Sequence, residues 1–169
     1  METKFKAIDP NLIEDNAFKL IGTDWMLITA GTLDNYNTMT ASGGGFGMLW
    51  KRKVCFCVIK PKHYTYSFME KAKYFTLSFF AEEYRSVLEF CGSTSGRDVD
   101  KVAAVGITPI KGASGTVYFA EARLVLECRK IYFQDIDPNH FIDPKIHERY
   151  PDKDYHRMYI GEIVRCLLK

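Results

Sequence analysis

Three short segments carry the side chains whose types and spacing are suited to chemistry. The first, Asn37-Thr38-Met39-Thr40-Ala41-Ser42, alternates amide and hydroxyl groups with apolar side chains and precedes a glycine-rich run at residues 43–47. A buried core strand does not carry so many hydroxyls, and a plain surface loop has little use for Met39. Such a segment favours a planar ligand with both polar and apolar edges, and the glycines predict a loop that turns close beside it.

The second segment, KPKHYT at residues 60–65, follows the apolar run VCFCVI. Within it stand Lys60, Lys62, His63, Tyr64 and Thr65. These cations and donors favour an anion, and a solvated surface loop is the alternative that the residues alone leave open.

The third segment, CGSTSGRDVDK at residues 91–101, combines hydroxyls, a glycine and positive charge. Ser95, Arg97 and Lys101 are its candidate anion ligands, and Gly96 lets a backbone approach closely. Asp98 is predicted to cap a helix whose first N–H groups face the same space. An ordinary capped helix start is the alternative. Together, the three segments favour a ligand with a flat polar ring and a phosphate.

Other binding classes find little support in the sequence. Neither GxGxxG opening a helix nor the GxxxxGK[ST] phosphate loop is present. The net charge is +2 with scattered Lys and Arg, so we expect no nucleic-acid partner. His140, His147 and His156 match no zinc spacing, and we expect no metal site.

The chain of 169 residues predicts a single domain over residues 1–169. No apolar run approaches the roughly 18 residues of a membrane-spanning helix, so no membrane partner is expected. The charged start METKFKAIDPNLIEDN lacks the apolar core of a signal peptide, which favours a cytoplasmic location. The five cysteines are predicted to be free and buried.

The elements that must position the three segments are mainly strands. Alternating and β-branched runs predict them at Asp24–Ala30, Asn37–Ser42, Val54–Ile59, Phe75–Phe80, Thr116–Phe133 and Arg157–Leu167. In the fifth, Glu127 falls with other charged residues on a face predicted to be wet, which is typical of antiparallel sheets. The predicted fold class is mainly β with peripheral α, an antiparallel barrel.

Helices are predicted to be few and peripheral. They are expected at Tyr64–Lys73, at Glu82–Cys91 with Gly92 as its stop, and at Asp98–Val105, with a helical turn near Asn16–Ile21. Residues 135–157, rich in Asp, Pro and His, predict a long functional or partner-contacting loop before the last strand.

The combination of MTAS at 39–42, KPKHYT, FTLSFF at 75–80 and SGRDVDK at 95–101 resembles the flavin reductase-like family, specifically its flavoredoxin-type branch. DWMLITAG at 24–31 and HRMYIGEI at 156–163 fit the same branch. The resemblance implies an FMN-binding split β-barrel that forms a homodimer, with flavin near the subunit interface.

The resemblance also implies roles for the three segments. Asn37–Ser42 would line the isoalloxazine edge through backbone N–H groups and the Thr40 and Ser42 hydroxyls. KPKHYT would approach the ribityl phosphate, with Ser95, Arg97 and Lys101 as further candidates. Two positions depart from the family pattern: many relatives have Trp at Gly43 and Arg at His63. The second departure predicts pH-dependent phosphate affinity.

The activity implied is that of an oxidoreductase, which passes electrons from NADH or NADPH through bound FMN to a flavin, a protein or a small acceptor. One alternative is an electron-transfer protein that receives electrons from a redox protein partner without using NAD(P)H. Another is a flavin-binding module without turnover. The sequence identifies no catalytic side chain and does not name the acceptor.

Overall fold

The computed structural model describes residues 4–169, so residues 1–3 of the predicted domain lie outside it. An eight-stranded antiparallel sheet has the order β3-β2-β6-β9-β10-β5-β4, with β1 paired to β10. Its strands are β1 (Lys6–Ile8), β2 (Met26–Thr32), β3 (Asn35–Ala41), β4 (Gly44–Leu49), β5 (Arg52–Ile59), β6 (Tyr74–Phe79), β9 (Leu124–Asp135) and β10 (Arg157–Leu168). A separate ribbon pairs β7 (Pro109–Lys111) with β8 (Val117–Phe119).

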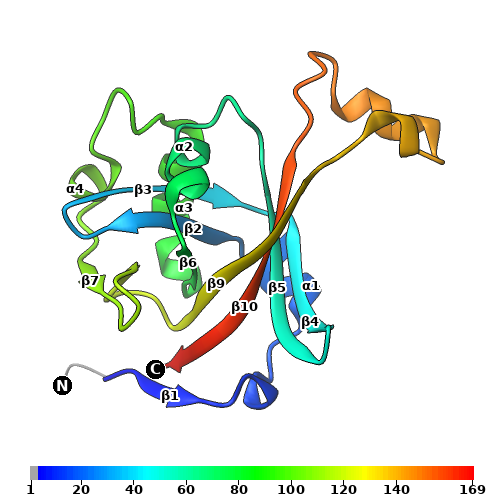
Figure 1. Cartoon of the computed structure of the whole chain (residues 1–169). Helices are drawn as coiled ribbons and strands as arrows, with labels where there is room; N and C mark the ends of the chain where they lie inside the picture. The colour runs from blue at the N-terminus through cyan, green and yellow to red at the C-terminus, as the bar shows by residue number, and fades with distance from the viewer. Residues whose placement is uncertain (1–3) are drawn as a thin grey trace.

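The sheet is rolled, because its two end strands are neighbours in the chain. Only Ser42 and Gly43 separate β3 from β4, although these strands lie at opposite ends of the strand order (Figure 1). Gly44 begins the second of them with φ 149°, and a Cβ there would lie 2.6 Å from the Phe56 carbonyl oxygen, so only glycine fits. The predicted mainly-β antiparallel split barrel is confirmed.

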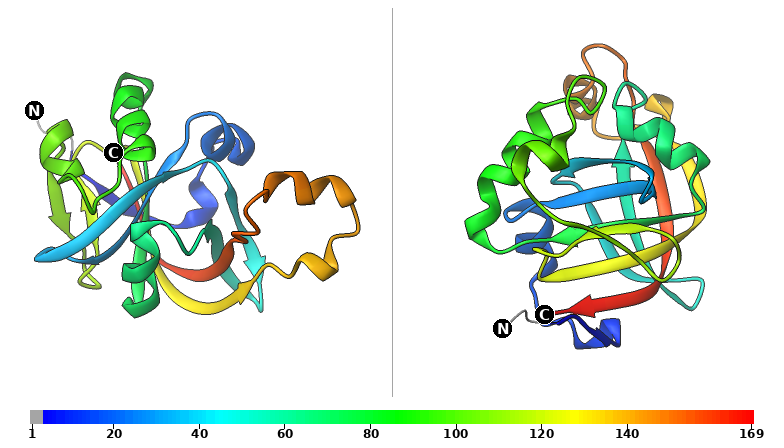
Figure 2. Two further views of the ribbon diagram at one scale, coloured as in Figure 1. Left: turned by 90° about the horizontal axis from the view of Figure 1, so that it is seen from above. Right: turned by 90° about the vertical axis from the view of Figure 1, so that its left-hand side faces the viewer.

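Short helices lie around the sheet (Figure 2). They are α1 (Ala17–Gly22), α2 (Tyr64–Lys71), α3 (Arg85–Ser93) and α4 (Lys101–Val105), with 3-10 turns at Pro10–Leu12, Glu82–Tyr84, Pro138–His140 and Pro144–Arg149. Helices α2 and α3 pack on β2 and β3, α4 packs on α3, and α1 packs on β4. Asn16 caps α1, accepting from the N–H groups of Phe18 and Lys19. The predicted helix near residues 16–21 is therefore confirmed.

Two buried clusters hold the layers together. One fills the rolled sheet around Met26, Ile28, Phe75 and Tyr159, and the other joins β2 to α3 and α4 through Leu27, Leu88 and Val102. All five cysteines are buried and free, as predicted.

One predicted strand and one predicted loop were wrong. Thr116–Phe133 is not one strand, because a turn over residues 120–123 separates β8 from β9. The glycine run after Ser42 does not form a loop but the strand β4, paired with β5 over its whole length. Tertiary pairing overrides the low strand propensity of glycine there.

Two further local expectations were also wrong. Gly92 does not stop its helix, since α3 continues to Ser93 with Thr94 as C-cap. Glu127 is not on a wet face but is fully buried, where its carboxylate accepts a 2.8 Å bond from the Thr116 hydroxyl. Hydrogen bonding to a neighbouring loop compensates the burial of this charge.

Residues 136–156 form an excursion that projects from the body of the molecule (Figures 1 and 2). Phe141, Tyr150 and Tyr155 pack against one another within it. Across residues 4–169, the helices are all too short or too polar to cross a membrane.

Candidate flavin-binding site

β3 is an edge strand that presents free backbone groups to the helices. The Thr38 carbonyl points away from β2 and accepts a 2.8 Å bond from Lys101 Nζ. The N–H and C=O of one residue point the same way in an antiparallel strand, and residues two apart share that direction. Thr38 and Thr40 therefore both present N–H groups to this edge, where a ligand can accept from them.

A hollow of about 320 Å³ lies beside this edge, and we call it the cationic hollow. Parts of β3, the start of α2 and the segment from the end of α3 to α4 meet around it. Nine of the thirteen residues selected from the sequence line it: Asn37, Met39, Thr40, His63, Tyr64, Thr65, Ser95, Arg97 and Lys101. Three segments distant in sequence therefore meet at one place.

The start of α2 supplies unpaired backbone donors to the cationic hollow. His63 is the N-cap residue, and its side chain makes no capping hydrogen bond. The first N–H groups of a helix have no intrahelical acceptor and carry a partial positive charge, so they attract anions. Asn37 Nδ2 donates a 2.7 Å bond to Thr65 Oγ1 and ties this helix start to β3.

Gly96 allows the third segment to reach β3. A Cβ at this position would lie 2.0 Å from Asn37 Oδ1 and 3.2 Å from Tyr64 Cδ1, so any side chain would displace both neighbours. The glycine therefore keeps Asn37 in place and brings the following arginine to the cationic hollow.

Arg97 is exposed, with its guanidinium partly engaged. Its Nη1 donates a 3.1 Å bond to the Lys62 carbonyl, and its Cζ lies 5.0 Å from the centroid of the Tyr64 ring. The Ser95 hydroxyl accepts a 3.2 Å bond from the Arg97 N–H. The remaining guanidinium donors are free to bind an anion in the cationic hollow.

Lys101 lines the cationic hollow and also supports the backbone around it. Its side chain is only 6% exposed, and Nζ donates 2.8 Å bonds to the carbonyls of Thr38 and Cys91. Burial lowers the pKa of its ammonium group. Asp98 does not cap the following helix as predicted: Asp100 does, accepting from the Ala103 N–H.

The imidazole of His63 is not fully satisfied by hydrogen bonds within residues 4–169. Its Nδ1 is buried without a hydrogen-bond partner among the described residues. Burial lowers the pKa of this imidazole, and the charges of Lys62, Lys60 and Lys101 lower it further. An anion bound in the cationic hollow, which His63 lines, would offset these positive charges. The residues present therefore fit a phosphate group.

The other four selected residues lie outside the cationic hollow. The Thr38 hydroxyl bonds Thr29 Oγ1 at 2.9 Å, and Ala41 packs against the core. Lys60 Nζ pairs with Asp154 at 3.1 Å, at the base of the excursion. Ser42 lines an adjoining hollow.

That adjoining hollow, which we call the Trp25 hollow, has a volume of about 330 Å³. Its lining comprises Trp25, Thr40, Ser42, Leu88, Glu89, Gly92 and Ser93. Thr40, Gly92 and Ser93 also line the cationic hollow, so the two form one groove along β3, the β3 groove. The sequence analysis did not select Trp25, although it stands in the motif DWMLITAG.

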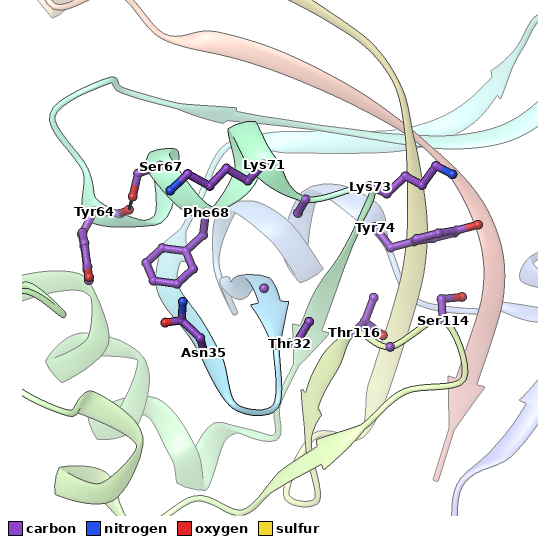
Figure 3. A pocket seen from close by; sticks show the side chains of 13 residues that line it. Thr32, Asn35, Tyr64, Ser67, Phe68, Lys71, Lys73, Tyr74, Ser114 and Thr116 are labelled. Atoms are coloured by element: carbon purple, nitrogen blue, oxygen red, sulfur yellow. Dashed lines mark hydrogen bonds between the residues drawn. The ribbon is translucent and has the colours of Figure 1, made fainter.

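A third hollow of about 610 Å³ lies along α2 (Figure 3). Of the thirteen selected residues, only Tyr64 lines it. Its lysines, Lys71 and Lys73, stand at the C-terminal end of α2, where the helix dipole opposes anion binding. The cationic hollow is therefore the better phosphate site despite its smaller volume.

A rolled antiparallel sheet with a cation-lined groove along one edge strand is compatible with a split barrel. A family profile described as "Flavin reductase like domain" matches residues 18–169. The chain therefore belongs to the flavin reductase-like family, as predicted. No curated protein sequence matches it closely enough to count as a relative.

Solved structures share the fold at low sequence identity. The FMN-binding protein from Thermus thermophilus with bound p-hydroxybenzaldehyde has a TM-score of 0.70 and 18% identity, over 100% of this chain and 82% of its own. Flavoredoxin from Methanosarcina acetivorans has a TM-score of 0.69 and 18% identity, over 99% and 76%. The NADH:FAD oxidoreductase SgcE6 of Streptomyces globisporus C-1027, in complex with NAD and FAD fragments, has a TM-score of 0.65 and 15% identity, over 87% and 75%.

Proposed function

We propose that this protein binds FMN in the β3 groove and acts as a flavin-dependent oxidoreductase. The observation that carries the proposal is the meeting of nine selected residues from three separate segments around one hollow. Family membership and the FMN-binding structural neighbours support it. When bound, FMN supplies hydride and electron chemistry, which the protein side chains lack.

The residues of the cationic hollow bind and orient the phosphate end. The N–H groups at the start of α2, the Arg97 guanidinium and the Ser95 hydroxyl donate to phosphate oxygens, and His63 adds charge when it is protonated. Lys101 holds the β3 edge in position by donating hydrogen bonds to the carbonyls of Thr38 and Cys91.

The β3 edge orients the ring through backbone donors and one hydroxyl acceptor. Thr40 Oγ1 donates its only proton to the Leu88 carbonyl at 2.5 Å, so toward a ligand this oxygen acts as an acceptor. The free N–H groups of Thr38 and Thr40 donate to carbonyl oxygens. This pattern is complementary to the alternating carbonyl and N–H groups of an isoalloxazine ring.

NADH or NADPH is the proposed electron donor, and a flavin, a protein or a small molecule is the acceptor. Similarity to an oxidoreductase solved with NAD supports this assignment. Similarity to flavoredoxin favours the second candidate, an electron carrier that receives electrons from a redox protein. Anaerobic stopped-flow mixing of the FMN-loaded protein with NADH and with NADPH distinguishes them: rapid bleaching supports the reductase, and a flavin stable to both supports the carrier.

FMN binding itself is tested by extraction of the purified protein. We expect a yellow protein that releases FMN on denaturation, because no adenosine-binding motif accompanies the phosphate site. A colourless protein that takes up no added FMN contradicts the proposal, and released FAD changes the cofactor.

We also propose that the protein is a homodimer. An apolar patch on the outer sheet face supports this, formed by Trp50 (55% exposed), Phe56 (40%) and Tyr132 (39%), with the Trp50 and Tyr132 ring centroids 5.8 Å apart. Phe56 on β5 and Tyr132 on β9 both pair with Ile160 of β10, so they flank β10 on the same face of the sheet. Exposed apolar patches commonly mark protein interfaces. Light scattering that gives a monomer mass would contradict the proposal.

A further inference from the structure

Trp25 lines the far end of the β3 groove, and the proposed cofactor contacts leave it unused. It stands one residue before Met26, whose partner on β3 is Ala41, and it borders the Trp25 hollow together with Ser42. The groove therefore has cations at one end and an aromatic ring at the other.

The Trp25 ring is clamped from one side. Arg85 Cζ lies 3.3 Å from the centroid of the ring, and Arg85 Nη1 donates a 2.6 Å bond to the Thr23 carbonyl. Contact of a guanidinium with an aromatic face is favourable and fixes the orientation of the indole. The indole also packs against the second buried cluster, and a ligand in the Trp25 hollow meets the part of the indole that borders this hollow.

The backbone of Trp25 is held in an unusual conformation. Its φ is 69°, in the left-handed region that side chains with a Cβ rarely adopt. Such a conformation persists only when neighbours impose it, and it is found most often at binding and catalytic sites. The two residues before Trp25 are held by the Lys19–Asp24 ion pair at 2.8 Å and by the Arg85–Thr23 bond.

The β3 groove has a suitable length for a flavin. Gly43 follows Ser42 in the chain, and a Cβ on it would meet only Val58 Cγ2, at 3.8 Å, so the end of the strand is uncrowded. From Asn37 to Ser42 the strand extends about 17 Å at 3.4 Å per residue. This span suits a ribityl phosphate joined to a three-ring system.

We propose that Trp25, held by Arg85, is the stacking platform for the isoalloxazine ring of the bound flavin. The inference rests on the proposed FMN binding and adds the residue that governs ring affinity. The two ends of the groove then have separate roles: Arg97 and His63 recognise the phosphate, and Trp25 recognises the ring that FMN and riboflavin share.

Titration of the full-length protein with FMN and with riboflavin tests the platform. Stacking of a planar ring on an aromatic side chain contributes strongly to affinity. Trp25→Leu should therefore lower the affinity for both FMN and riboflavin by about tenfold or more. Trp25→Phe keeps an aromatic face and should stay within about threefold of the wild type. Trp50→Phe, which keeps an aromatic ring in the proposed dimer patch, is the matched control and should leave both affinities within about twofold of the wild type.

Fluorescence provides a second measurement, because the chain has two tryptophans. In Trp50→Phe only Trp25 emits, and saturating riboflavin should abolish almost all of this emission. In Trp25→Phe only Trp50 emits, and a larger fraction should remain. If Trp25→Leu does not fold, this comparison carries the test, and persistent Trp25 emission at saturation overturns the platform.

The outcomes separate the platform from flavin binding itself. A wild-type protein that binds neither ligand overturns both proposals. A wild type that binds flavin while folded Trp25→Leu retains both affinities within about twofold overturns the platform alone. Loss of FMN affinity without loss of riboflavin affinity also overturns it, because that pattern assigns Trp25 to the phosphate end.

Discussion

Replacing Arg97 with Ala is expected to weaken FMN binding while leaving riboflavin binding nearly unchanged. The two ligands share the ring and the ribityl chain and differ in the phosphate. Arg97 points into the cationic hollow with only one donor bonded to protein, at the Lys62 carbonyl. The substitution therefore removes a phosphate ligand and one surface hydrogen bond, with little effect on the core.

The expected magnitude follows from the exposure of the guanidinium. A hydrogen bond to a charged group contributes about 1.5–3 kcal/mol. Water and salt reach Arg97, so the lower end applies. About 1.4 kcal/mol corresponds to a tenfold increase in Kd for FMN. Riboflavin should change by less than about twofold.

Lys101→Met is the contrasting substitution, because this lysine is buried. It leaves the Thr38 and Cys91 carbonyls without their donor, at about 1–3 kcal/mol each. The unfolding free energy should fall by about 2 kcal/mol or more, with a decrease in Tm of at least about 4 °C. Both ligands should weaken together, because the β3 edge that orients the ring loses its support.

Fluorescence-quenching titrations with both ligands and urea unfolding of each variant measure these effects. Equal losses of FMN and riboflavin affinity in Arg97→Ala would refute the phosphate assignment. A Lys101→Met protein of wild-type stability that loses only FMN affinity would show that the ammonium group is a phosphate ligand first and a structural group second.

Three further predictions test other parts of the structure. Burial lowers the pKa of His63, so the folded, ligand-free protein binds this proton less readily than the unfolded chain does. The free energy of unfolding should therefore fall as the pH drops below about 6.5, and His63→Gln should reduce this fall. In the wild type the ratio of FMN to riboflavin affinity should rise as this imidazole protonates, relative to His63→Gln measured over the same pH range. Gly96→Ala should abolish tight binding of both ligands by displacing Asn37, which is 2.0 Å from the added carbon; unchanged titrations would contradict the close approach. Phe56→Glu should shift the dimer toward monomer by light scattering, and an unchanged mass would place the interface elsewhere.

Local residue types in the sequence identified the three segments that meet around the cationic hollow. The hydroxyl-rich strand, the cations of KPKHYT and the glycine before Arg97 were all recognisable, since each segment is short and has an unusual composition for its position. Their meeting place was predicted through family resemblance, because no local pattern states which strand edges become neighbours when a sheet rolls.

The roles that the sequence did not reveal depend on distant partners. From its sequence context Lys101 is expected to be a solvated cation. In the structure its ammonium group instead donates to two backbone carbonyls, one on β3 and one on α3. Glu127 alternates with apolar residues as a surface position would, yet the loop around Thr116 folds over it. Trp25 reads as the apolar start of a strand, and only the position of Arg85 shows that its ring is clamped.

The polar residues of β3 have a second role that explains why the groove is formed before a ligand binds. Asn37 bonds Thr65 of α2, Thr40 bonds the Leu88 carbonyl of α3, and the Thr38 carbonyl holds Lys101 of α4. Each helix that contributes to the groove is thus fixed to the strand by a hydrogen bond within the protein. A ligand entering such a groove loses little affinity to ordering the protein. In the proposed flavin site, the hydroxyls and amides that suggest ligand contacts in the sequence would therefore act largely by preorganising the backbone donors beside them.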